Sequence, residues 1–209
     1  MSRPFFTSII ENHNHTAYDL DILPPQVGLD GGAFDSYGTL VGMPNEKKAL
    51  ELLRRAAFIC MPIMRHHGWE LPALYELCAC SNCWGITHFL DHQPINSRGR
   101  PIQSRKHAFF LLRVRSVRDP YVFLSMDNIV QTLLHEMAHL EFRWHFDGFY
   151  RVNAQLHDEL LHEVSSGFLQ GKVEQHEIPQ QFHRHGEIFQ AMRKEIQDVF
   201  GKRIPNAVQ

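Results

Sequence analysis

The chain has 209 residues, a formal net charge of −2 and a pI near 6.7. A chain of this length buries a hydrophobic core without disulfide bonds, so it corresponds to one domain with or without extensions. The near-neutral charge excludes a protein whose whole surface attracts nucleic acid and leaves only a local basic patch for such a contact.

No apolar run approaches the roughly 20 residues of a membrane span, and the N-terminus lacks the apolar core of a signal peptide. Of the 4 cysteines, Cys78, Cys80 and Cys83 stand too close together for ordinary disulfide geometry. We therefore expect a soluble intracellular protein in a reducing compartment, without a membrane partner.

Residues 1–37 contain the turn signals LPP and GLDGG and no sustained apolar period, so we treat them as an N-terminal extension. The domain then spans residues 38–209. Its first clear element is a helix that begins after Asn45, a candidate cap, and carries apolar residues at helical spacing. Gly68 ends this helix, and Pro62 is a point at which it can bend.

Residues 69–77 predict a strand or extended segment, and the cysteine cluster follows it. Residues 108–117 predict a strand, because apolar side chains at every second position alternate there with further apolar and basic ones. The basic residues Arg113 and Arg115 place this strand at a sheet edge or half exposed.

Apolar residues at helical spacing predict a buried helix within residues 128–145, with Ser125 and Asp127 as candidate caps. The Asp-Gly pair that follows breaks the pattern, and two further helices are predicted over residues 149–170 and 184–202. An early helix, then strands, then several helices give an α+β fold.

The segment HEMAH within the buried helix carries the candidate chemistry. His135 and His139 are four residues apart, so they lie about 40° apart on one helix face and can hold one ion. Glu136 projects beside that ion, where a carboxylate can take a proton from water and pass it to a leaving amine. Zinc with a fourth position open for water needs a third protein ligand.

His145 and His185 are the candidates for the third ligand. On an unbroken helix His145 would point about 120° away from His139, so the helix would have to end near residues 142–144, which include neither Gly nor Pro. His185 precedes a glycine at the start of a separate predicted helix, which could carry it to the ion. We favour His145, partly because of the family resemblance that these motifs carry.

The stretches PIMRHHGW, NSRGRPIQ, FLSMDNIVQTLLHEMAHL and HFDGFYRVNAQLHDEL follow one another within residues 37–161. Together they resemble the WLM family of zinc metalloproteases, which is related to the SprT-like and Spartan proteases. The resemblance implies a zincin-like fold, in which the HExxH helix packs on a small mixed sheet with extra C-terminal helices. It also implies zinc-dependent cleavage of proteins crosslinked to DNA, in a nuclear or nucleo-cytoplasmic repair setting.

By the same resemblance, His135, His139 and His145 would hold zinc and Glu136 would be the general base. Many members have Gly-Pro just before the third histidine, where this chain has Arg143 and Trp144.

Two other features have a functional and a structural interpretation. The cysteine cluster with His88 could bind a second zinc, but CxCxxC is not a standard spacing, and buried free cysteines are common. Basic residues after residue 97 could contact phosphates of DNA or simply line a solvated strand edge; they are Arg98, Arg100, Arg105, Lys106, Arg113 and Arg115.

The residues therefore predict an endopeptidase that binds an extended protein substrate along the strand of residues 108–117. The alternative is a non-catalytic, zinc-stabilised domain that binds nucleic acid or protein, with four protein ligands on the metal.

Overall fold

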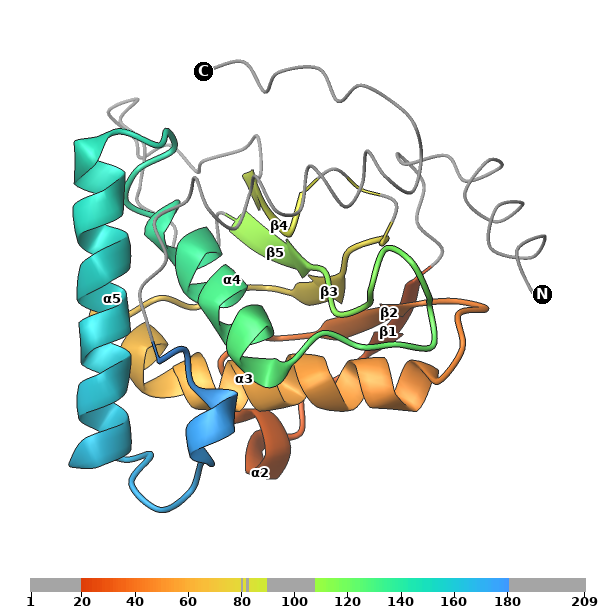
Figure 1. Ribbon diagram of the computed structural model, residues 1–209, viewed down its shortest axis with the longest axis horizontal. Helices are drawn as coiled ribbons and strands as arrows, with labels where there is room; N and C mark the ends of the chain where they lie inside the picture. The colour runs from red at the N-terminus through yellow and green to blue at the C-terminus, as the bar shows by residue number, and fades with distance from the viewer. Residues whose placement is uncertain (1–19, 80, 82, 90–107, 181–209) are drawn as a thin grey trace, which may run out of the picture.

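A mixed sheet with helices on one face makes up residues 20–79, 81, 83–89 and 108–180, which the computed structural model describes (Figure 1). The strands are β1 (Leu20–Leu23), β2 (Tyr37–Leu40), β3 (Leu74–Glu76), β4 (Gly85–Phe89) and β5 (Ala108–Leu112), in the order β1-β2-β3-β5-β4. Strands β2, β3 and β5 are parallel, whereas β1 and β4 are antiparallel to their neighbours and form the edges of the described sheet. Mixed strands with helices confirm the predicted α+β class.

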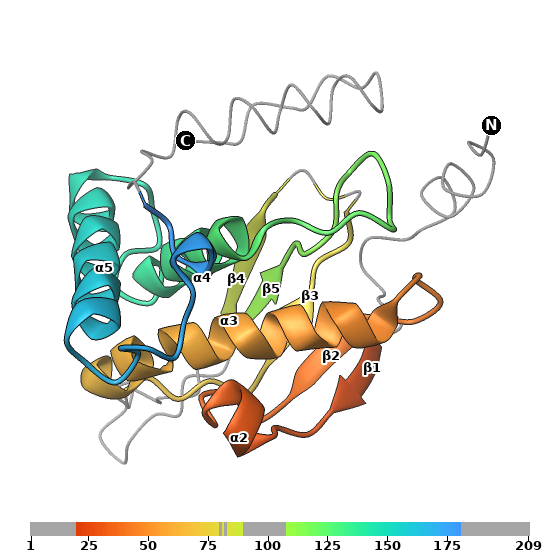
Figure 2. The same ribbon diagram turned by 60° about the horizontal axis from the view of Figure 1, so that its bottom comes forward.

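The described helices are α2 (Val27–Asp30), α3 (Glu46–His67), α4 (Met126–Ala138), α5 (Asp147–Ser165) and the 3-10 helix η1 (Gln175–Glu177). Helix α3 packs on β2 and β3, α4 packs on β4 and β5, and α5 contacts both of these helices (Figures 1 and 2). The helix predicted over residues 184–202 lies outside the described residues. Among the helices that are described, none has the length and apolar character needed to cross a membrane.

Helix α3 begins and ends where the sequence predicts. Asn45 stands at its start with a left-handed backbone (φ 57°), and its carbonyl accepts the amide of Lys48, although its side chain makes no capping bond. Gly68 ends the helix at φ 66°, a conformation that glycine adopts without a Cβ clash. The helix continues past Pro62 to His67.

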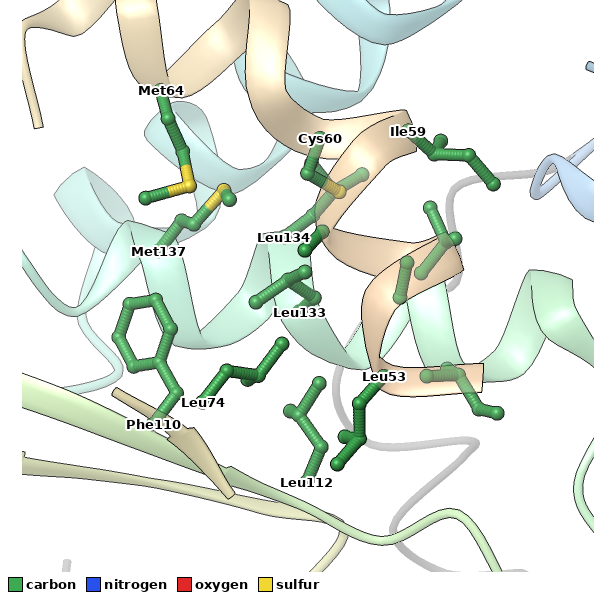
Figure 3. Close-up of a cluster of buried hydrophobic side chains, with 14 of the residues drawn as sticks. Leu53, Ile59, Cys60, Met64, Leu74, Phe110, Leu112, Leu133, Leu134 and Met137 are labelled. Carbon is green, nitrogen blue, oxygen red and sulfur yellow. The ribbon is translucent and has the colours of Figure 1, made fainter. Parts of the chain in front are cut away.

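The buried face of α4 fills the space between α3 and the sheet (Figure 3). Leu133, Leu134 and Met137 of α4 lie among side chains of α3, β3 and β5, namely Cys60, Met64, Leu74, Phe110 and Leu112. Each such buried side chain contributes about 1.5–3 kcal/mol through removal of apolar surface from water. This packing anchors α4 from behind and therefore fixes the position of the polar residues on its other face.

Strand β5 is not an edge strand, so that prediction was wrong: it lies between β3 and β4. The strand ends at Leu112, and Arg113 and Arg115 turn inward, with only 1% and 0% of their surfaces exposed. The Arg115 Nε donates to the buried Glu76 carboxylate at 2.5 Å. Arg113 donates to the Ser81 carbonyl. Their acceptors come from distant parts of the chain, and this is why local alternation misjudged their exposure.

The folded unit extends at both ends beyond the stretch that carries the WLM resemblance. Strand β1 pairs with β2 from Leu20 opposite Leu40 onward, so the last part of the expected N-terminal extension belongs to the sheet. At the other end, Arg55 of α3 donates through Nε and a terminal nitrogen to both carboxylate oxygens of Glu177, each at 2.6 Å. This bidentate pair ties η1 back to α3.

Candidate metal centre

Helix α4 ends at Ala138, directly before His139, without a Gly or Pro to stop it. The chain tightens into a 3-10 turn instead, in which the Leu140 amide donates to the carbonyl three residues back at 2.9 Å. No residue of the loop that follows has a positive φ. The turn therefore needs no glycine, and this explains how Arg143 and Trp144 fit where many WLM members have Gly-Pro.

A second tight turn presents His145. The Phe146 amide donates to the Trp144 carbonyl at 2.8 Å, so the chain bends sharply at His145. Helix α5 begins two residues later at Asp147. Because α4 has already ended, the backbone at His145 does not follow the helix, and the His145 side chain points back towards His135 and His139.

The three imidazoles converge on one point. One ligand nitrogen from each of His135, His139 and His145 lies within 4.8 Å of the others, and Nε2 of His145 is 3.1 Å from Nε2 of His135. Two nitrogen ligands of one tetrahedral zinc would stand about 3.3 Å apart, given zinc–nitrogen distances of about 2.0–2.1 Å. The observed spacing suits a shared ion, and the residues described here contain no second group of this kind.

Phe149, in the first turn of α5, forms the floor of this three-histidine group. Its ring centroid lies 4.8, 4.6 and 4.7 Å from those of His135, His139 and His145. The Phe149 side chain is fully buried in the core. The imidazoles therefore rest on a rigid aromatic surface and cannot fold into the interior.

Hydrogen bonding and burial favour imidazoles that can bind a cation. Nδ1 of His139 lies 3.0 Å from the Phe142 carbonyl, so Nδ1 carries the proton and Nε2 keeps its lone pair. Burial lowers the pKa of His139. Partial desolvation and then the charge of His139 lower the pKa of His145 to about 4. Both rings are therefore neutral near pH 7, the form that ligates metals.

Glu136 is buried next to this group and is held by strand β4. The hydroxyl of Thr87 lies 2.7 Å from Glu136 Oε2 and 3.0 Å from the Glu136 carbonyl oxygen. Burial raises the pKa of Glu136 to about 8, whereas the hydrogen bonds with Thr87 lower it. A cation bound by the histidines would also favour the ionised carboxylate.

Gly85 lets the Glu136 carboxyl group approach β4 closely. A Cβ added at Gly85 would lie 2.5 Å from Glu136 Oε1, closer than atoms can pack. Gly85 and Thr87 are opposite Leu112 and Phe110 in the register with β5, so they share the sheet face that α4 covers. Neither residue was predicted from the sequence, although a glycine inside a strand pattern is a recognised sign that another group approaches the backbone closely.

Of the predicted site residues, His135, Glu136, His139 and His145 gather at the end of α4. His185, the alternative third ligand, lies outside the described residues. So do four members of the predicted basic patch, Arg98, Arg100, Arg105 and Lys106.

The other two members of that patch, Arg113 and Arg115, are buried with protein acceptors and are not available to phosphate groups, which corrects the prediction.

The cysteine cluster also differs from the expectation of free thiols. Cys78 is buried and forms a disulfide bond, so its sulfur is not a thiolate ligand in this state. Cys83 is half-buried and forms no disulfide bond. His88 is exposed, and its ring centroid lies 4.7 Å from that of Phe109. Cys80 lies outside the described residues.

The fold and the site define an α+β protein with a candidate three-histidine metal centre. A model of the WLM domain matches residues 33–198 of the 209-residue chain, so the chain belongs to the WLM domain family. This match reaches well beyond residue 161, where the motif resemblance ended.

Two solved structures of Wss1 are similar to the chain. That from Saccharomyces cerevisiae is 24% identical, with a TM-score of 0.49, and the likeness covers 62% of this chain and 89% of that one. That from S. pombe is 24% identical, with a TM-score of 0.46, covering 61% and 92%. None of the curated proteins compared with the chain matches it.

Proposed function

We propose that this chain is a zinc-dependent endopeptidase of the zincin type. One observation carries the proposal: three imidazoles meet at one point, next to a buried glutamate that follows the first of them in α4. The chain also belongs to the WLM family, and its motifs resemble those of WLM zinc metalloproteases, which supports the same reaction class.

The donor set fits zinc. Three imidazoles with nitrogen atoms a few ångströms apart would leave the fourth position of a tetrahedral zinc open, as catalytic zinc sites do. His135, His139 and His145 would hold the ion, and the Phe142 carbonyl would keep the His139 ring in its ligating tautomer.

A zinc ion in this site would supply a Lewis acid that polarises a peptide carbonyl and a water molecule. Glu136 would accept a proton from the water as it attacks the carbonyl carbon, and would pass that proton to the leaving amine nitrogen. Thr87 and Gly85 hold the carboxylate in position for both transfers, since one donates a hydrogen bond to it and the other leaves room for it.

The substrate chain would bind along β4, not along the strand first considered. Among the described strands, β4 pairs with β5 alone, so its other edge can accept an extended chain by strand addition. Glu136 packs against this same strand. A peptide bound there would therefore bring its backbone close to the general base.

By family resemblance, the substrates would be proteins crosslinked to or bound on DNA, and the site of action would be nuclear or nucleo-cytoplasmic. With Arg113 and Arg115 buried, any DNA contact would have to use other basic residues. A direct test of this coupling is digestion of a DNA-linked protein substrate with and without single-stranded DNA.

The reaction itself is tested with Glu136→Gln, which keeps the shape of the side chain and removes its basicity. The variant should retain one zinc per chain and lose cleavage of a denatured protein substrate. A variant that digests the substrate at the wild-type rate would exclude Glu136 as the base. A structure in which four protein ligands hold the metal, together with a wild-type protein that cleaves no substrate, would favour the non-catalytic binding domain instead.

A further inference from the structure

Three aromatic side chains stand exposed at alternate positions of the loop between α4 and α5. Phe142, Trp144 and Phe146, here called the aromatic rim, expose 41%, 62% and 69% of their surfaces. Single exposed apolar residues are ordinary, but several large ones within five residues form a patch of the kind that binds a partner. Burial in the core does not explain these side chains, so their role is sought at the surface.

The aromatic rim lies at the metal centre. Trp144 and Phe146 flank the ligand candidate His145 in sequence, and the Phe142 carbonyl accepts the hydrogen bond from His139. The rim residues are therefore direct neighbours of two of the three candidate ligands, His145 in sequence and His139 through a hydrogen bond.

The same loop also touches the far end of strand β4. The guanidinium of Arg143 lies over the ring of Phe89, 4.4 Å from its centroid. Phe89 is the last residue of β4, and it shares the helix-facing side of the strand with Gly85 and Thr87. The loop that carries the rim therefore contacts the end of β4, the strand that meets Glu136 at Gly85 and Thr87.

We propose that the aromatic rim binds large apolar side chains of an extended, unfolded polypeptide and so selects the substrate of the site. This inference rests on the proposed endopeptidase function and names its substrate class. Folded proteins bury such side chains, whereas an unfolded segment presents them together with the free backbone that strand addition needs.

The length of β4 sets which substrate positions meet the rim. Strands rise about 3.3 Å per residue, so Phe89 lies about 13 Å along the strand from Gly85. A peptide paired with β4 near Glu136 would therefore bring side chains about two to four residues from the scissile bond to the rim. Selectivity should act on these positions and leave the scissile residues themselves less restricted.

The charges of the loop favour a polypeptide over single-stranded nucleic acid. Bases also stack on aromatic rings, but nucleic-acid grooves combine such rings with positive charge along the backbone. Here the charged side chains near the rim are Glu141, Arg143 and Asp147, and the one cation among them is placed over Phe89.

The test is a binding assay that does not depend on cleavage. In the full chain carrying Glu136→Gln and loaded with zinc, fluorescence anisotropy would follow a labelled extended peptide with phenylalanines spaced along it, and a matched peptide with serines instead. The double variant Trp144→Ser with Phe146→Ser should bind the phenylalanine peptide about tenfold to a hundredfold more weakly, which is the effect of no longer burying one aromatic side chain. The serine peptide should bind all forms equally, which also shows that the double variant is folded.

Tyr121→Ser is the matched control. Tyr121 exposes 65% of its surface and precedes α4, so it stands at the opposite end of that 13-residue helix from His139, about 20 Å away. This control should bind both peptides like the parent protein.

Equal affinity of the phenylalanine peptide for the parent and the double variant would overturn the proposal. So would a double variant that loses affinity for a labelled single-stranded oligonucleotide and keeps its affinity for the peptide. If the peptide result holds but the wild-type protein with zinc cleaves no bound peptide, the rim stands as a polypeptide-binding surface and the endopeptidase proposal fails.

Discussion

Gly85→Ala offers the sharpest test of how strand β4 holds the general base. The new methyl group would lie 2.5 Å from Glu136 Oε1, 2.8 Å from its Cγ and 2.9 Å from its Cδ. Gly85 is not among the described residues with a positive φ, so alanine fits its backbone without strain. The substitution therefore acts on the Glu136 side chain and not on the strand itself.

The size of the effect follows from the displacement. Ordinary contact distances are about 3.5 Å, so the carboxyl group has to move by roughly 1 Å. A misplacement of this size at a reacting group lowers the rate about 100-fold. We expect kcat to fall by about that factor, with a smaller change in KM. The free energy of unfolding should also fall, by about 1–3 kcal/mol, because the crowded Cγ and Cδ belong to a buried side chain.

The assay compares kcat and KM for a quenched-fluorescence peptide between wild type and Gly85→Ala, with zinc content measured for each. His88→Ala is the control, since His88 lies on the same strand with its side chain on the opposite face and exposed. A Gly85→Ala protein with wild-type kcat would refute the reasoning that the contact between β4 and Glu136 positions the base. A loss of zinc with the loss of rate would show that the change disturbed the ligands instead.

Other outcomes follow from the same geometry. Thr87→Val should lower kcat by about tenfold to a hundredfold, because a hydrogen bond to a charged group contributes about 1.5–3 kcal/mol, and Thr87→Ser should restore most of it. Phe149→Ala should lower the free energy of unfolding by about 3–5 kcal/mol in urea titrations. It should also weaken zinc binding, measured by competition with a chelator, because the three imidazoles lose the ring that they pack against. In metal-free protein, the free energy of unfolding should fall as pH rises from about 6.5 to 8, because folded Glu136 keeps its proton up to a pKa of about 8 while the unfolded side chain has lost it near 4.5. Below about pH 6.5 the lowered pKa values of the histidines act in the opposite sense, so the slope is read above that pH, and Glu136→Gln should abolish it.

Sequence patterns alone were enough for the parts of the fold that depend on near neighbours. The 3.6-residue period located α3 between Asn45 and Gly68, and the α+β class followed from the order of the elements. The same period put His135 and His139 on one face of a buried helix, because residues four apart are neighbours on any α-helix. These predictions needed no knowledge of what packs against each element.

The position of His145 could be predicted only in part from the sequence. For His145 to reach the same ion as His135 and His139, the helix has to end before residue 145, but no Gly or Pro marks that end in the sequence. The structure supplies that end through a 3-10 turn after Ala138 and a tight turn at His145. Both turns use ordinary backbone conformations, so no residue type in the sequence marks them.

Only the tertiary structure decided which strand is the edge and which polar groups are buried. The alternation of residues 108–117 was compatible with an exposed basic strand, but β5 pairs on both sides, and Arg115 meets Glu76 from 39 residues earlier. Likewise, the contacts of Gly85 and Thr87 with Glu136 join residues about 50 positions apart. Strand order and such pairings depend on which distant segments come together in the folded chain. Periodicity along the sequence reflects only residues that lie a few positions apart.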